Sequence, residues 1–289
     1  MDVPRALSAE TRLVVLLGDP VAHSRSPHLH NAAFQADGID WAYLACRVAP
    51  GREAEAVAGL RALSIAGANV TVPHKEAVLP HLDDLSDGAR AIGAVNTIVR
   101  DGDRLTGHNT DVTGFLEPLQ PHADRLRGAE MVILGAGGAA RAVAYGLLAS
   151  SSPTRLTLAA RTTSRAEAVA EALAPYDAHG ALDVVGLPDA GARIREAMLV
   201  VNATPVGMGK GAAQTPWPGI DDFRSGHLVY DLVYTPRPTR LLREAATQGA
   251  DTLDGWPMLI YQAAAAYRLW TGRPMPPSVL HSSLSAGPR

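Results

Sequence analysis

Short hydrophobic runs alternate with amphipathic segments along the first part of the chain. The runs are apolar and rich in β-branched residues, and we expect strands over residues 12–18, 40–48 and 67–72. The segments between them repeat their apolar positions at helical spacing, which predicts helices over residues 26–38 and 52–64. This alternation indicates an α/β protein, with a further helix expected to begin at Pro73.

Two β-rich runs then flank the sequence RDGD at residues 100–103. Asp101-Gly102 is a strong turn signal, so residues 94–111 are predicted to form a β-hairpin. A helix and a proline-containing connection follow over residues 112–128, and we place a domain boundary there.

The second half begins with a hydrophobic strand at residues 131–134, followed by a glycine-rich turn and an amphipathic helix. Further strands are expected in RLTLAA, MLVVNATPVGMG and HLVYDLVYTPRPTRLL, which together predict a Rossmann-type, doubly wound sheet. The apolar stripe MLIYQAAAAYRLW is expected to be a helix that packs on the first domain. The predicted organisation is an α/β domain over residues 1–112, completed by helices over residues 253–289, with a Rossmann domain over residues 113–252.

Composition narrows the function classes. The 289-residue chain is 47% hydrophobic with a net charge of −3, and no basic run interleaved with aromatic residues is present, so nucleic acid is not an expected partner. Cys46 is the only cysteine, which excludes an internal disulfide and fits a reducing compartment. Neither a signal peptide nor a membrane span is evident. We expect a cytoplasmic protein with no membrane partner.

Lys75 lies in an unfavourable position for an ordinary lysine. It falls in the first turn of the helix expected after Pro73, where the helix dipole disfavours a positive charge. Most lysines are solvated surface groups, so either its stem lies along the surface or its lowered basicity is used. This segment alone leaves both interpretations open.

The glycine-rich turn matches the pattern G-x-G-x-x-A. Glycines at such a turn let backbone N–H groups approach a pyrophosphate at the helix N-terminus. A plain tight turn has the same pattern, but the strand and helix that follow favour a dinucleotide site. Its predicted residues are Gly135, Ala136, Gly137, Gly138 and Ala139.

The next strand ends without an acidic residue. NAD-binding proteins place a carboxylate near this point to accept the ribose hydroxyls, whereas this chain continues with Arg161, Thr162 and, one turn on, Arg165. Two guanidiniums and a hydroxyl suit the 2′-phosphate of NADP, because arginine forms bidentate, charge-assisted hydrogen bonds with phosphate. A solvated basic helix start is the alternative, but it would oppose the helix dipole. We expect NADP as the cofactor.

The residues that follow the last two predicted strands are expected on the cofactor side of the sheet. In open α/β sheets, ligands bind beyond the carboxyl ends of the strands. Asn202 and Thr204 follow one strand, and Leu232 and Tyr234 follow the other, so all four are expected near the cofactor.

Other kinds of site are not supported. His28 and His30 are two residues apart, which directs them to different sides of a helix, and no H-E-x-x-H motif or cysteine pair is present, so we predict no metal. Ser24 and Ser26 lack the G-x-S-x-G elbow of a hydrolase.

Several longer motifs occur together along the chain. They are GDPVAHSRSPHLHN, GANVTVPHK, GAVNT, HNTD, GAGGAARA, ARTTSRA, VNATPVGM and a late DGWPMLIYQAA. In their order and spacing the chain resembles the shikimate/quinate dehydrogenase family over nearly its whole length. The resemblance implies reversible, NADPH-dependent reduction of 3-dehydroshikimate to shikimate in chorismate and aromatic amino-acid biosynthesis. It also implies that the first domain binds the substrate.

The resemblance further implies individual site residues. Ser24 and Ser26 match the serines that bind the substrate carboxylate, and Gly255 and Met258 match positions beside the nicotinamide. The residues that match positions around the substrate ring are Asn69, Thr71, Lys75, Asn96, Asp111, Tyr234 and Gln262.

A proton-transfer role for Lys75 follows from the chemistry. Hydride transfer to a carbonyl creates an alkoxide that must be protonated, and the reverse reaction needs a base. We assign Lys75 as the general acid in reduction and the general base in oxidation, with Asp111 orienting it and binding substrate.

Three departures from the family pattern keep alternatives open. Ala160 replaces a frequent asparagine, Val112 follows NTD where glycine is usual, and Asp254 replaces a glycine two residues before Trp256. A relative that acts on quinate or aminoshikimate, including an NAD-linked one, is therefore the second hypothesis.

A non-catalytic, NADP-binding regulatory protein is the third hypothesis. Arg161 and Arg165 favour the biosynthetic enzyme over an NAD-linked relative, and the presence of both Lys75 and Asp111 argues against a pure binding protein. The ligands expected are small molecules, and the expected assembly is a monomer or a homodimer.

Overall fold

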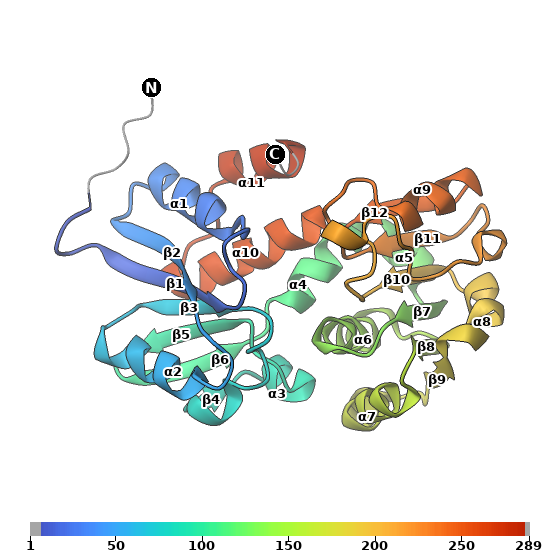
Figure 1. The fold of residues 1–289 in the computed structure, drawn as a ribbon, viewed down its shortest axis with the longest axis horizontal. Coiled ribbons are helices and arrows are strands. Elements are labelled where there is room, and N and C mark those ends of the chain that lie inside the picture. Colours follow the sequence, from blue (N-terminus) through green and yellow to red (C-terminus); the bar gives the residue numbers. More distant parts are fainter. Residues whose placement is uncertain (1–6, 287–289) are drawn as a thin grey trace. The chain divides into compact units, whose positions relative to one another are not determined.

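The computed structural model describes residues 7–286, and its chain divides into two compact units (Figure 1). The first unit comprises residues 7–110 and 260–286, and the second comprises residues 111–259. The α/β class expected from the alternating pattern is confirmed. No helix in the described residues is long and apolar enough to cross a membrane.

A six-stranded mixed sheet forms the centre of the first unit, in the order β2-β1-β3-β5-β6-β4. Its strands are β1 (Arg12–Gly18), β2 (Trp41–Arg47), β3 (Gly67–Val70), β4 (Asp84–Leu85), β5 (Thr97–Asp101) and β6 (Arg104–His108). Strands β5 and β6 form the predicted antiparallel hairpin around Gly102. The helices of this unit are α1 (Ser26–Ala36), α2 (Glu53–Ala62), α3 (Asp87–Ile92), α11 (Pro277–Ala286) and α10 (Trp256–Thr271) from Ile260 onward.

The helix expected from Pro73 does not form. Residues 72–78 are a series of turns, followed by a short 3₁₀ turn at Leu79–His81. The carbonyl of Lys75 accepts a hydrogen bond from the N–H of Val95 (2.8 Å) instead of from residue 79. Pro80 has no N–H for the carbonyl of Glu76, so α-helical hydrogen bonding cannot continue there. Lys75 therefore lies in a series of turns, and the prediction that it falls in the first turn of a helix is wrong.

Aromatic side chains pack around His30 on one face of the first sheet. The His30 ring stacks on Tyr43 with ring centroids 4.6 Å apart, and Trp270 lies 5.2 Å away. Neither ring nitrogen of His30 has a hydrogen-bond partner within residues 7–286, and the side chain is fully buried. Burial lowers the pKa of His30 to about 3, because the charged imidazolium would be desolvated.

The buried His30 makes the stability of the protein sensitive to acid. Below its unfolded pKa of about 6.5, the unfolded chain binds a proton that the folded state does not bind until about pH 3, so stability falls as the pH falls. The expected loss is about 2 kcal/mol at pH 5 relative to neutral pH. We expect the variant His30→Phe to lose this component when the free energy of unfolding in urea is compared at pH 7 and pH 5.

The exposed His28, on the same helix, provides the control. A His28→Gln variant should keep the acid sensitivity of the parent protein. An equal pH dependence in the parent and in His30→Phe would show that His30 is not the responsible group.

The second unit is built on a parallel sheet in the order β12-β11-β10-β7-β8-β9. Its strands are β7 (Glu130–Leu134), β8 (Arg155–Ala160), β9 (Leu182–Gly186), β10 (Leu199–Asn202), β11 (Leu228–Asp231) and β12 (Asp251–Asp254). Numbered by their sequence within this unit, the strands follow the Rossmann order 3-2-1-4-5-6, as predicted. The two strands at the edges, β9 and β12, were not predicted.

Helices cover both faces of this parallel sheet. They are α4 (Asp111–Leu116), α5 (Ala123–Leu126), α6 (Gly138–Ser151), α7 (Thr163–Leu173), α8 (Gly191–Glu196) and α9 (Arg240–Thr247). Side chains of α4, α6 and α7 share one hydrophobic core, and those of α8 and α9 share the other. Val112 lies in α4 and packs near Gly146 of α6, where an added Cβ would be 3.3 Å from the valine methyl. Valine at this position is therefore accommodated in a helix.

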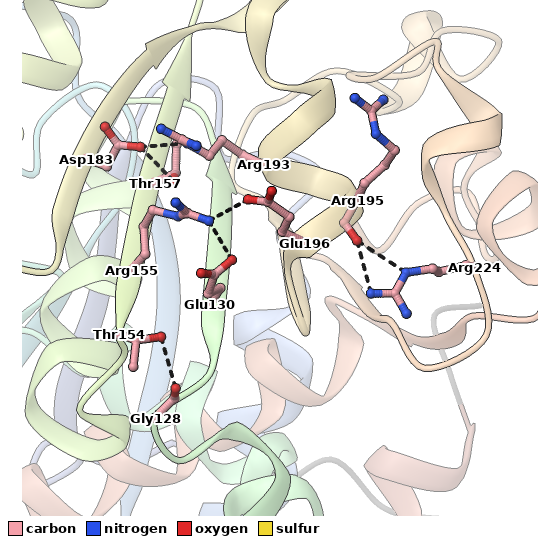
Figure 2. Close-up of polar contacts among 10 residues, drawn as sticks. All are labelled: Gly128, Glu130, Thr154, Arg155, Thr157, Asp183, Arg193, Arg195, Glu196 and Arg224. Atoms are coloured by element: carbon pink, nitrogen blue, oxygen red, sulfur yellow. Dashed lines mark hydrogen bonds and ion pairs between the residues drawn. The ribbon is translucent and has the colours of Figure 1, made fainter.

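A charged network joins the amino ends of several strands of the parallel sheet (Figure 2). Arg155, the first residue of β8, donates a hydrogen bond to Glu130 at the start of β7 (2.6 Å) and another to Glu196. Arg193 donates to Asp183 in β9 at 2.9 Å. Partly exposed pairs of this kind each contribute little to stability. Because ligands of such sheets bind at the carboxyl ends, this network lies at the end away from the candidate site.

Candidate active site

A pocket of about 490 Å³ lies at the carboxyl ends of the strands on either side of the topological switch point. The loops after β7, β8 and β10 form most of its wall. The lining residues are Leu134, Gly135, Ala136, Gly137, Ala159, Ala160, Arg161, Thr162, Arg165, Leu187, Ala203, Thr204, Pro205, Val206, Thr215 and Pro216. The size and position of the pocket suit a dinucleotide.

The glycine-rich turn brings backbone close to this pocket. Gly135 has a φ of +119°, and a Cβ there would lie 3.0 Å from the methyl group of Thr204, so a larger residue would be strained. Gly137 precedes the first residue of α6 and provides no side chain to cap it, which leaves the N–H groups of the first turn available to an anion. Gly138 and Ala139 lie in that first turn. The turn therefore fits a pyrophosphate.

Two arginines at the end of β8 face the same pocket. Arg161 and Arg165 are exposed, and neither guanidinium has a hydrogen-bond or ion-pair partner among residues 7–286. Thr162 lies between them and also lines the pocket. No aspartate or glutamate is among the lining residues. The charges therefore suit the 2′-phosphate of NADP and leave no acid for the ribose of NAD.

Asn202 lies behind the pocket lining and holds Thr204, one of the lining residues, by hydrogen bonds. It is fully buried and is not among the residues that line the pocket, so its direct contact with the cofactor stays a prediction. Its Oδ1 accepts hydrogen bonds from the N–H (2.9 Å) and the hydroxyl (2.7 Å) of Thr204, while its Nδ2 donates to Asp231 at 2.8 Å. Burial raises the pKa of Asp231, against hydrogen bonds from Thr239, Val233 and Asn202 that lower it. This network fixes the turn that carries Thr204.

The remaining predicted cofactor residues, Leu232, Gly255 and Met258, lie outside the lining of this pocket. A Cβ on Gly255 would come within 2.0 Å of the carbonyl oxygen of Leu232, so only glycine permits this approach of the two loops. Met258 packs against the core of the second unit. Nearby, the ring centroids of Tyr234 and Trp256 are 6.0 Å apart.

In the first unit, the two asparagines predicted to bind the substrate belong to one buried network. Asn69 donates from Nδ2 to the carbonyl of Asn96 (3.0 Å) and to the hydroxyl of Thr97 (3.1 Å). Asn96 in turn accepts from the N–H of Thr110 at 2.7 Å. The hydroxyl of Tyr43 donates to Asn69 at 2.7 Å. Sequence reasoning missed Tyr43, Thr97 and Thr110 as supports for these asparagines.

The other predicted substrate residues lie on separate segments. The N–H of Ser26 donates to the hydroxyl of Ser24 at 3.2 Å, at the start of α1. Thr71 and Lys75 share the loop between β3 and the 3₁₀ turn, and Gln262 lies in α10. Asp111 is buried and begins α4, directly after Thr110.

The Rossmann order, the phosphate-binding turn and the paired arginines define an NADP-binding α/β protein. Comparison with known proteins identifies its family. Three family models match the chain: "Shikimate dehydrogenase substrate binding domain" over residues 16–98, "Shikimate / quinate 5-dehydrogenase" over residues 118–207 and "Shikimate 5'-dehydrogenase C-terminal domain" over residues 255–284.

Individual relatives agree with the family models. A shikimate dehydrogenase (NADP(+)) from Salinibacter ruber is 56% identical over 97% of this chain and 99% of its own. A solved shikimate dehydrogenase in complex with NADP+ has a TM-score of 0.91 and 35% identity, with 99% of each chain covered. A quinate dehydrogenase from Corynebacterium glutamicum in complex with NAD has a TM-score of 0.87 and 34% identity over 96% of this chain and 99% of its own. This chain belongs to the shikimate dehydrogenase family.

Proposed function

We propose that this chain is an NADP-dependent dehydrogenase that interconverts 3-dehydroshikimate and shikimate on the route to chorismate and the aromatic amino acids. The observation that carries the proposal is the pair of arginines at the end of β8, which have no acidic residue beside them in the pocket. The Salinibacter ruber relative bears the name of the same NADP-linked activity. The proposal includes a cytoplasmic location, small-molecule ligands only and a monomeric or homodimeric state.

The two parts of the chain have separate tasks in this proposal. Residues 1–112 and 253–289 bind the substrate, and residues 113–252 bind NADP. The backbone of Gly135, Ala136 and Gly137 holds the pyrophosphate, because these residues line the pocket before α6. Arg161 and Arg165 hold the 2′-phosphate.

Most of the residues assigned to the substrate belong to the first unit, where they bind and orient it. The hydroxyls of Ser24 and Ser26 donate to its carboxylate. Asn69, Thr71 and Asn96 hold the ring hydroxyls, and buried hydrogen bonds preset the two asparagine side chains. Tyr234 and Gln262 complete the residues assigned to the substrate.

Lys75 and Asp111 manage the proton. When bound, NADPH supplies the hydride that reduces the substrate carbonyl. Lys75 donates the proton to the resulting oxygen, and in oxidation it accepts the proton of the hydroxyl. Asp111 orients Lys75 and accepts a hydrogen bond from a substrate hydroxyl.

The substrate assignment is tested by initial rates of NADP reduction with shikimate and, separately, with quinate. We expect a kcat/KM for shikimate at least tenfold above that for quinate. A preference for quinate would leave the cofactor assignment standing but would replace the biosynthetic assignment with a catabolic one. No turnover of either acid would favour a non-catalytic NADP-binding protein.

A further inference from the structure

The loop that carries Lys75 is held by a buried histidine. His74 precedes Lys75 and is 1% exposed, so its side chain points into the protein. Its Nδ1 lies 2.7 Å from a carboxylate oxygen of Glu53, the first residue of α2. Its Nε2 lies 2.8 Å from the carbonyl oxygen of Val48, which follows β2. Both contacts reach residues more than twenty positions earlier in the chain.

The two contacts use both ring nitrogens of His74. The carbonyl of Val48 can only accept a hydrogen bond, so Nε2 donates to it, while Nδ1 faces the carboxylate of Glu53.

The surroundings of Glu53 favour its ionised form. The same carboxylate oxygen accepts a hydrogen bond from the N–H of Gly51 at 3.2 Å. The pKa of Glu53 is lowered first by the backbone N–H of its own residue, and then by Gly51 and His74. Its place at the N-terminus of α2 also suits a negative charge.

Resting on the proposed function, we propose that the contacts of His74 with Glu53 and Val48 are a positioning device for Lys75. These contacts attach the loop to the segment between β2 and α2. On the other side, the carbonyl of Lys75 accepts a hydrogen bond from Val95, the residue before Asn96. Adjacent residues of the loop are therefore fixed to two different parts of the unit, which restricts where the Lys75 amino group can reach.

Kinetics test the positioning role. Glu53→Ala removes one of the two attachments, and we expect it to lower kcat for shikimate oxidation about tenfold while the KM for NADP stays unchanged, since small misplacements of a catalytic group slow the chemical step. Glu53→Gln keeps an acceptor for His74, so we expect kcat within about threefold of the parent. If the contact between His74 and Glu53 had a purely structural role, Glu53→Ala would not lower kcat selectively while the KM for NADP stays unchanged.

The matched control is Glu55→Ala, two residues along the same helix. Glu55 is exposed and pairs with Arg52 instead of the loop. We expect it to leave kcat unchanged. If the parent oxidises shikimate and Glu53→Ala matches it, the positioning proposal is wrong while the proposed function stands.

A second readout holds even if the parent protein does not oxidise shikimate. The chain has only two lysines, Lys75 and Lys210, so their ¹⁵N side-chain signals are simple to assign. Glu53→Ala should shift the Lys75 signal and leave that of Lys210 in place. An unshifted Lys75 signal would overturn the proposal independently of the enzyme assay.

Discussion

Replacement of Lys75 by methionine is expected to lower kcat for shikimate oxidation by about 10²- to 10⁴-fold, the usual contribution of a general acid–base group. This corresponds to about 3–5 kcal/mol of transition-state stabilisation. Methionine keeps much of the length of the side chain but cannot carry the proton. Because Lys75 lies in the first unit and the pocket for NADP lies in the second, the dissociation constant for NADP should not change. Stopped-flow single turnovers and fluorescence titration measure the two quantities.

Two further variants separate proton transfer from charge. Lys75→Arg keeps a positive charge but stays protonated, so it should remain as slow as Lys75→Met. Lys210→Met removes the other lysine of the chain, which is exposed in the second unit, and should leave kcat unchanged. A Lys75→Met protein that binds both ligands and turns over at the parental rate would refute the proton-transfer role.

Removal of both arginines at the end of β8 is expected to abolish the preference for NADP. Hydrogen bonds to a charged group contribute about 1.5–3 kcal/mol, so each arginine should account for about a 10- to 150-fold change in NADP affinity. The double variant Arg161→Ala, Arg165→Ala should therefore raise the KM for NADP by at least 10²-fold. The measurement is the steady-state KM for each dinucleotide with shikimate saturating.

NAD lacks the 2′-phosphate and serves as the internal control for this variant. The kcat/KM for NAD should change by less than about threefold, because NAD has no 2′-phosphate for either guanidinium to bind. Equal losses with NADP and NAD would mean that the arginines stabilise the pocket and do not recognise the phosphate. Arg240→Ala, which removes an exposed arginine paired with Glu244 on α9, should leave both values unchanged.

The parts of the fold that sequence predicted correctly are those determined by neighbouring residues. Residues 14–18 of strand β1 are a continuous buried run, and the turn at Gly135 needs a glycine because of its positive φ. Arg161 and Arg165 follow a buried strand directly, so their approach to the pocket follows from local chain direction. The cofactor class could therefore be predicted before the structure was known.

The features that sequence did not predict depend on distant partners. The loop at Lys75 is not helical because Val95, twenty residues later, donates to its carbonyl. Strand β12 has the sequence DTLD, with no hydrophobic run, and it exists because β11 offers an edge for pairing. Asn202 ends a strand like a ligand-binding residue, but Asp231 holds it in the interior. In each case a hydrogen bond from a distant segment overrides the local pattern.

The substrate residues, whose roles remain predictions, also depend on partners that are distant in the sequence. Family motifs indicated Asn69 and Asn96, while the hydroxyl of Tyr43 that orients Asn69 lies 26 residues earlier in the chain. The sequence around His74 gave no signal for its contacts with Glu53 and Val48, since both partners lie more than twenty residues earlier in the chain. Spacing along the chain cannot reveal contacts of this kind.

The most direct test of the central claim is the ratio of kcat/KM for NADP to that for NAD, measured with saturating shikimate on the full-length protein. The arginine pair and the absence of an acid in the pocket predict a ratio of at least tenfold in favour of NADP. A ratio of one or below, or no oxidation of shikimate with either dinucleotide, would contradict the assignment of an NADP-linked shikimate dehydrogenase.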